Sequence, residues 1–365
     1  MKIAVLGTRG IPNFYGGFEQ FTQYLSEDLV KRGHDVYVYN SHNHPYQEKS
    51  WNGVKIIHCK DPEDKIGTVG QFIYDLNCII DSRKQDFDII LQLGYTSSSV
   101  WNWLFPKKSV IITNMDGLEW KRSKYSKPVQ KFLLIAERLA VKFSDYLISD
   151  SVGIQKYLKE KYNVESEYIP YGANVIESIN ENVLDEFSLK KEDYNLLIAR
   201  MEPENSIETI LQAFVNSNTN KKFVVIGNTE NKYGRYIRNK FSDKRIIYLG
   251  YVSGIEKLDA LRKFSNLYFH GHTVGGTNPS LLEAMSSEAL ICANDNEFNK
   301  DILGDDAYYF HCKNCIIPLF EMEKLDERSI FILNNINKIK EKYSWDKINS
   351  DYENIMLSSV ESREK

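Results

Sequence analysis

Short apolar runs alternate with longer amphipathic stretches along the first part of the chain. Residues 2–7 form a continuous apolar run that ends in glycine, which is typical of a strand buried on both faces of a parallel sheet. Gly33 is a helix stop, and residues 34–39 resemble a second strand. Between the two runs, apolar side chains recur at helical spacing: Phe18, Phe21, Leu25 and Leu29. The pattern therefore predicts a β-α-β unit.

The same alternation continues to about residue 340 and predicts two series of strands. In the first half, further strands are expected at residues 54–58, 88–93, 109–113 and 145–150. In the second half they are expected at residues 194–200, 222–227, 245–250, 266–269 and 289–293. We therefore predict an α/β fold of two doubly wound domains that face each other across a cleft.

The length of 365 residues also favours two domains over one. Residues 1–173 are assigned to the first domain, since Pro170 and Gly172 mark a hinge. Residues 174–193 are polar, acidic and without periodicity, so a linker is expected there. The second domain is expected at residues 194–340, with a C-terminal helix at about 341–365 that packs back on the first domain.

A glycine-rich turn at residues 270–278 lies between a predicted strand and a predicted helix that begins near Pro279. Glycines let backbone N–H groups approach a phosphate, and the helix dipole favours its negative charge. Glu283 lies one turn inside the helix, where its carboxylate could accept hydrogen bonds from a ribose. A purely structural turn would fit this pattern equally well.

The turn after the first strand is a second candidate for a ligand loop. Its glycines do not follow the GxGxxG spacing of dinucleotide-binding proteins, which disfavours a nicotinamide cofactor. The wider loop predicts that a diphosphate or sugar approaches Gly16 and Gly17. Arg9 is the only cation in this loop and is expected to clamp a phosphate, unless it is an ordinary surface arginine.

Carboxylates follow the predicted strand at 109–113, where open α/β sheets place their sites. Asp116 and Glu119 are the ones best located to touch a sugar hydroxyl. Residues 120–142 then combine seven cations and many apolar residues with a single acid, Glu137. Such a segment can lie on an anionic membrane surface, or it can be a core-packing helix with a solvated charged face.

Composition narrows the class of protein. Hydrophobic content of 42% and charged content of 26% are those of a soluble globular protein, and the net charge of −4 disfavours nucleic acid as a partner. No apolar run reaches the roughly 18 to 20 residues of a membrane span, and no signal-peptide pattern is present, so a cytoplasmic location is expected.

Cys312 and Cys315 form a lone CxxC, from which we expect free thiols and no zinc. Asp86 and Asp88 resemble a DxD metal motif but precede their strand, so no metal site is predicted.

Several strings resemble family-4 glycosyltransferases, which have the GT-B fold of two Rossmann-like domains. The general likeness covers nearly the whole chain and lies in Gly16-Gly17, residues 169–172, Ala199-Arg200 with Pro203-Glu204, and residues 280–285. Longer strings resemble the branch of bacterial rhamnosyltransferases of capsule and cell-wall polysaccharide assembly: residues 8–12 with 15–19, residues 116–122, and residues 270–280.

This resemblance implies roles for particular residues. Arg200 would neutralise the donor diphosphate, and Glu283 would hold the ribose. Gly250 and Tyr251 would receive the base. Phosphate would accept hydrogen bonds from the preceding loop, here Gly275, Gly276, Thr277 and Asn278.

The chain departs from the family at three points. Gly275 stands where the family has the first glutamate of an E-x7-E pair, and Asn205 stands near the position of the usual lysine. Arg9, Lys121 or Arg122 would then supplement the positive charge. The usual active-site histidine of the first domain is not obvious in this sequence, and Asp116, which stands near its expected place, is the candidate base or sugar contact.

The expected activity is retaining glycosyl transfer from a nucleoside-diphosphate sugar, without a metal or other cofactor. The resemblance favours deoxythymidine-diphosphate L-rhamnose (dTDP-rhamnose) as donor and a lipid-linked saccharide as acceptor. Residues 120–142 would touch the inner membrane leaflet. Alternatives are another UDP- or GDP-sugar as donor, a sugar-nucleotide epimerase, and a non-catalytic sensor of sugar nucleotides.

Overall fold

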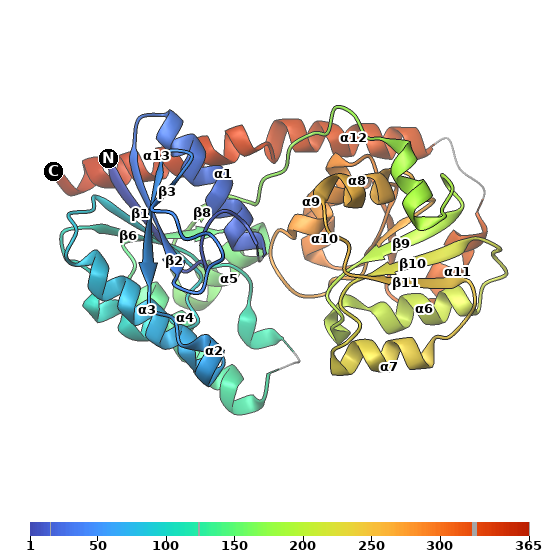
Figure 1. The fold of residues 1–365 in the computed structure, drawn as a ribbon, viewed down its shortest axis with the longest axis horizontal. Helices are drawn as coiled ribbons and strands as arrows, with labels where there is room; N and C mark the ends of the chain where they lie inside the picture. The colour runs from blue at the N-terminus through green and yellow to red at the C-terminus, as the bar shows by residue number, and fades with distance from the viewer. Residues whose placement is uncertain (15, 123–124, 323–326, 365) are drawn as a thin grey trace. The chain divides into compact units, whose positions relative to one another are not determined.

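The computed structural model describes residues 1–14, 16–122, 125–322 and 327–364. Two compact units are present (Figure 1). Unit 1 comprises Met1–Tyr171 and Trp345–Lys365, and unit 2 comprises Gly172–Ser344. Both are doubly wound α/β units, which confirms the predicted fold class.

Unit 1 is built on an eight-stranded sheet of order β3-β4-β2-β1-β5-β6-β7-β8, parallel except for the β3–β4 pair. Its strands are β1 Lys2–Leu6, β2 Asp35–Ser41, β3 Ser50–Trp51, β4 Val54–Cys59, β5 Ile89–Leu93, β6 Val110–Asn114, β7 Tyr146–Ser149 and β8 Glu167–Tyr168. Every residue of β5 and β6 is buried, as expected for central parallel strands covered on both faces. The chain order changes direction between β1 and β5, so the ligand crevice of this sheet is expected at their carboxyl ends.

The helices of unit 1 cover this sheet: α1 Gly17–Lys31, α2 Glu63–Ile66, α3 Val69–Ser82, η1 Ser99–Leu104, η2 Glu119–Lys121, α4 Lys127–Phe143, α5 Val152–Tyr162 and α13 Trp345–Glu364. Helix α13 comes from the far end of the chain and packs beside α1 (Figure 1). The Tyr352 ring lies 4.9 Å from the Phe21 ring, and both side chains are buried. Glu353 accepts hydrogen bonds from Arg32 at 3.0 Å and from His34 at 2.7 Å.

Unit 2 has a six-stranded, wholly parallel sheet of order β11-β10-β9-β12-β13-β14. Its strands are β9 Tyr194–Ile198, β10 Lys222–Ile226, β11 Ile246–Gly250, β12 Tyr268–His270, β13 Ile291–Asn294 and β14 Tyr308–Phe310. Helical segments flank it: η3 Glu181–Phe187, η4 Pro203–Asn205, α6 Ile207–Val215, α7 Lys232–Lys240, α8 Ile255–Lys263, α9 Pro279–Ser286, α10 Glu297–Leu303, α11 Lys313–Glu321 and α12 Glu327–Lys342. In the stretch expected as linker, η3 packs against α8 within unit 2. The order reverses between β9 and β12, where a Rossmann-like sheet binds its ligand.

Candidate functional site

The loops after β9 and β12 dock against each other at the switch point of the second sheet. The backbone N–H and the Oγ1 hydroxyl of Thr273 donate to the Glu204 carbonyl oxygen at 3.0 and 2.9 Å. Gly271 sits so close that a Cβ atom there would lie 2.0 Å from the Asn205 carbonyl oxygen. Only glycine fits this position, so the two loops form one rigid platform.

Arg200 leaves this platform with an exposed side chain. Its carbonyl oxygen accepts a 2.7 Å hydrogen bond from Asn205 Nδ2, and Asn205 is only 4% exposed. Asn205 therefore shapes the loop and brings no positive charge to the place where the resembling family has a lysine. No ion pair between residues that the structure describes includes Arg200, so its guanidinium can meet an incoming anion.

The glycine-rich turn ends in a capped helix. Gly275 has φ +139°, a conformation that side-chain-bearing residues rarely adopt, and nothing lies within 4 Å of where its Cβ would be. The Asn278 side chain accepts a 3.0 Å hydrogen bond from the Ser280 N–H, and Pro279 starts α9. Gly276 and the buried Thr277 lie between these points, ahead of the positive end of the helix dipole.

Glu283 is held by an arginine that the sequence analysis did not single out. Arg262 Nη2 lies 2.5 Å from Glu283 Oε2, and Arg262 Nη1 lies 2.9 Å from Asp259 Oδ1. Arg262 is 1% exposed, while the Glu283 side chain keeps 24% exposure. Burial alone would lower the pKa of Arg262, but the neighbouring Glu283, Tyr268 and Asp259 outweigh burial and raise it. Glu283 is thus anchored from inside and still open to a hydroxyl group.

Two histidines stack at the end of β12. The rings of His270 and His272 are 4.3 Å apart and nearly parallel. Burial, and then the neighbouring His272, lowers the pKa of His270 well below its usual value, so His270 is neutral. Asn296 and Asn299 donate to the His272 carbonyl oxygen at 2.9 and 3.2 Å. His272, Asn296 and Asn299 border a small cavity against the glycine-rich turn, which is also lined by Val274, Gly275, Gly276, Asn278 and Phe298.

Gly250 and Tyr251 lie at the same carboxyl edge, at the end of β11 and two strands from β9. Gly250 has φ +68°, and Tyr251 is 84% exposed. An exposed aromatic ring at this edge offers a stacking surface. The predicted site residues of the second unit thus share one sheet edge: Arg200, Gly250, Tyr251, Gly275, Gly276, Thr277, Asn278 and Glu283.

The predicted residues of unit 1 lie at the carboxyl edge of the other sheet. Glu19, a buried residue, accepts hydrogen bonds from Thr8 Oγ1 at 3.2 Å and from the Arg9 N–H at 2.9 Å, which fixes the loop after β1. Gly16 caps α1 and Gly17 begins it. The Arg9 guanidinium pairs with Glu63 at 2.6 Å, so part of its charge is already neutralised.

Asp116 follows β6 in a left-handed backbone conformation with φ +46°. Its N–H donates to Asn114 Oδ1 at 2.9 Å, and Asn114 in turn donates to the Tyr352 hydroxyl of α13 at 2.7 Å. Arg122 forms an ion pair with Glu119 at 2.6 Å, so part of the charge of this arginine is neutralised within its own loop. In the DxD-like string, Asp88 Oδ2 accepts the Lys2 N–H at 2.7 Å, which is a structural use of that carboxylate.

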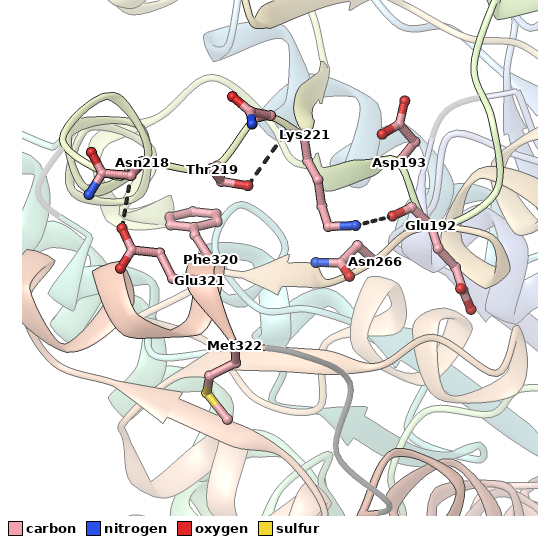
Figure 2. Close-up of a pocket in the computed structure, with 10 residues that line it drawn as sticks. Glu192, Asp193, Asn218, Thr219, Lys221, Asn266, Phe320, Glu321 and Met322 are labelled. Carbon is pink, nitrogen blue, oxygen red and sulfur yellow. Dashed lines mark hydrogen bonds between the residues drawn. The ribbon is translucent and has the colours of Figure 1, made fainter.

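A larger hollow of about 800 Å³ lies at the opposite, amino edge of the second sheet (Figure 2). Its lining includes Asp193 before β9, Lys221 before β10 and Asn266 before β12. Lys221 Nζ points across it and donates to the Glu192 carbonyl oxygen at 2.7 Å (Figure 2). None of the predicted site residues lines this pocket, so size alone does not locate the site.

Comparison with known proteins assigns the two halves of the chain. The family described as "Glycosyl transferases group 1" matches residues 180–344, and a "Domain of unknown function (DUF1972)" matches residues 1–174. An uncharacterized glycosyltransferase of Methanocaldococcus jannaschii, MJ1069, is 25% identical over 392 residues, covering 97% of this chain and 98% of the relative.

Solved structures with the same fold cover the whole chain. Sucrose-phosphate synthase from Thermosynechococcus elongatus superposes with a TM-score of 0.81 at 14% identity, covering 99% of both chains. Anabaena Alr3699/HepE, solved in complex with UDP and glucose, gives a TM-score of 0.76 at 12% identity, covering 98% of this chain and 99% of that one. These likenesses identify the fold as GT-B. The chain therefore has the GT-B fold, with a domain of the glycosyl transferases group 1 family at residues 180–344 and a DUF1972 domain at residues 1–174.

Proposed function

We propose that the protein transfers a sugar from a nucleoside-diphosphate donor to an acceptor hydroxyl with retention of configuration. The observation that carries the proposal is the exposed Arg200 on the loop platform that also carries the glycine-rich turn ahead of α9. As the sugar departs, negative charge grows on the β-phosphate. Arg200, the amides of Gly276, Thr277 and Asn278, and the helix dipole would stabilise that charge. Glu283, anchored by Arg262, would bind the ribose.

We propose Tyr251 as the surface for the base and Asp116 as the contact to a sugar hydroxyl or to the acceptor proton. The resemblance of residues 8–12, 116–122 and 270–280 to bacterial rhamnosyltransferases favours dTDP-rhamnose as the first donor to test. Retention on that β-linked donor would give a β-rhamnoside. A UDP-sugar is the second candidate, because the similar HepE structure holds UDP and glucose.

We propose a lipid-linked saccharide as acceptor, reached from the membrane surface through α4. The exposed residues of this helix include Lys127, Lys131, Ile135, Arg138 and Lys142, which recur on one face, and also Val129 and Phe143 near its two ends. Its one acid, Glu137, is buried and accepts hydrogen bonds from Tyr157, Tyr162 and Lys161 at 2.7 to 2.9 Å. No ion pair among the described residues neutralises the four cations of this face. That arrangement suits anionic lipid headgroups. No helix among the described residues is long and apolar enough to cross a bilayer.

A thermal-shift panel of dTDP-rhamnose, UDP-glucose and GDP-mannose tests the donor. A ligand at 100 times its dissociation constant adds about 2.7 kcal/mol of stability, which is a readily measured shift. The donor that shifts the transition is then incubated with and without a lipid-linked acceptor. Transfer only with acceptor supports the proposal, whereas donor isomerisation or hydrolysis alone indicates an epimerase. Binding of no sugar nucleotide would overturn the proposal.

A further inference from the structure

A pair of thiols lies at the carboxyl end of β14, outside the site described above. Cys312 caps the N-terminus of α11, and Cys315 lies one turn further on. Their Sγ atoms are 2.6 Å apart, and both side chains are partly exposed. The other three cysteines, Cys59, Cys78 and Cys292, are buried. Among the five, only this pair combines close approach with access to solvent.

The surroundings make the two sulfurs unequal. A hydrogen bond from the Cys315 thiol lowers the pKa of Cys312, and the same contact raises the pKa of Cys315. The N-terminal end of α11 also favours a thiolate at Cys312. His311 Nε2 lies 3.4 Å from Cys315 Sγ, close enough to take its proton.

The distance between the sulfurs favours a disulfide over a metal. Two thiolates bound to one tetrahedral Zn²⁺ at about 2.3 Å must stand roughly 3.8 Å apart. A disulfide needs about 2.05 Å. The observed 2.6 Å is nearer to the covalent distance, and the described residues around it offer only His311 as a third ligand.

We infer that Cys312 and Cys315 form a redox-active dithiol that is oxidised by small-molecule disulfides. The Cys312 thiolate attacks one sulfur of the disulfide, forms a mixed disulfide and releases one thiolate. Cys315 loses its proton to His311 or water, attacks Cys312 Sγ and releases the second small thiol. Two cysteines are oxidised by two electrons, one small disulfide is reduced to two thiols, and the Cys312–Cys315 bond is formed.

The chain contains a built-in readout for this bond. Lys313 lies between the two cysteines, so trypsin places Cys312 in the peptide 301–313 and Cys315 in the peptide 314–324. Full-length protein is equilibrated with oxidised glutathione, the remaining thiols are alkylated, and the digest is read by mass spectrometry. We expect the two peptides to be joined, with Cys59, Cys78 and Cys292 still reduced, and we expect reductant to separate them.

Single variants test the assigned order of attack. Cys315→Ser should accumulate glutathione on Cys312, and it should react faster at neutral pH than Cys312→Ser, because Cys312 keeps its position at the N-terminal end of α11, which favours the thiolate. Cys292→Ser is the matched control and should behave as the native protein. Equal rates in the two variants would overturn the assigned order of attack. Separate, fully alkylated peptides in oxidised glutathione would overturn the site itself, as would stoichiometric Zn²⁺ that protects both thiols.

Discussion

Charged side chains at the carboxyl edge of the second sheet fall into two groups. Arg262 is buried and forms ion pairs with Glu283 and Asp259, so its charge holds these carboxylates in place. Arg200 stands exposed a few residues from the glycine-rich loop's docking point. The first arginine therefore supports the site from inside, while the second is available to a ligand.

Arg200→Ala is expected to lower turnover by about 10²–10³-fold while the protein stays folded, since a preorganised cation at a developing charge has an effect of that size. The measurement is kcat with the donor identified by thermal shift. Arg238→Ala, which removes an exposed arginine of α7, is the matched control and should leave kcat unchanged. Near-normal turnover in Arg200→Ala would remove this residue from the mechanism.

Arg262→Leu is expected to cost about 3–5 kcal/mol of unfolding free energy, because it leaves the carboxylates of Asp259 and Glu283 without their buried cation. Urea unfolding measures the change. Lys263→Leu is the neighbouring control, whose surface pair with Glu288 contributes less than about 1 kcal/mol. Similar losses of unfolding free energy in both variants would show that the buried ion pairs of Arg262 contribute no more to stability than the surface pair of Lys263.

At the scale of elements, α3 carries a buried acid. Burial raises the pKa of Asp75 to about 7, and the nearby charge of Asp61 acts in the same direction. A 2.6 Å hydrogen bond from Ser97 acts in the opposite direction and lowers this pKa. The folded protein thus holds a proton on Asp75 that the unfolded chain has already lost above its usual pKa near 4. Stability from this group is full below about pH 4 and declines as pH rises toward 7.

Asp75→Asn should remove that decline. The stability of the native protein relative to the variant should fall by up to about 4 kcal/mol between pH 4 and pH 8, because the pKa of Asp75 lies near 4 in the unfolded chain and at about 7 in the folded protein. Urea unfolding across this pH range measures the difference, and Asp64→Asn at an exposed position of α2 is the control. A difference that is flat with pH would show that Asp75 ionises normally.

Helix α4 presents its charges on one face, and this face can be tested separately from catalysis. Lys131→Glu with Lys142→Glu should weaken binding to phosphatidylserine vesicles at least about tenfold, since each cation near such a surface contributes about 1 kcal/mol. Vesicle sedimentation measures binding. Lys156→Glu with Lys159→Glu on α5 is the control pair, because these lysines already lie near acids. An equal loss of vesicle binding in both double variants would show that binding depends on the net charge of the protein, and not on the cationic face of α4.

At the scale of the whole molecule, the first unit is completed by the last helix. Trp345, Ile348, Tyr352, Ile355 and Met356 of α13 belong to the same buried cluster as the strands of β1 and β5. Residues from opposite ends of the chain therefore fold as one unit.

Ending the chain at Ser344 should leave the first unit unfolded or aggregated, because the apolar face of α1 loses its cover. Ending it at Val360, which keeps the buried part of α13, should preserve the native transition. Size-exclusion chromatography and circular dichroism distinguish the two outcomes. A soluble, cooperative protein ending at Ser344 would contradict the role given to α13.

Local patterns were enough to predict most strands of both sheets and the strand-turn-helix around the glycine-rich loop. Continuous apolar runs and helix-capping residues act within a few positions of themselves, so Asn278, Pro279 and the run before them carry their own signal. Arg262 carried no such signal. In the sequence it is one of many helical cations, and only packing shows that it is buried beside Glu283.

By itself, the sequence determined the class of fold, the two series of strands and the residue types available for binding a phosphate, because these depend on spacing along the chain. Tertiary structure alone decided that Arg9 is paired with Glu63, that Glu137 is buried while its cationic neighbours are exposed, and that Gly271 docks on the loop of Asn205. Such contacts join residues far apart in the chain, and their energies depend on burial and geometry that no local pattern encodes.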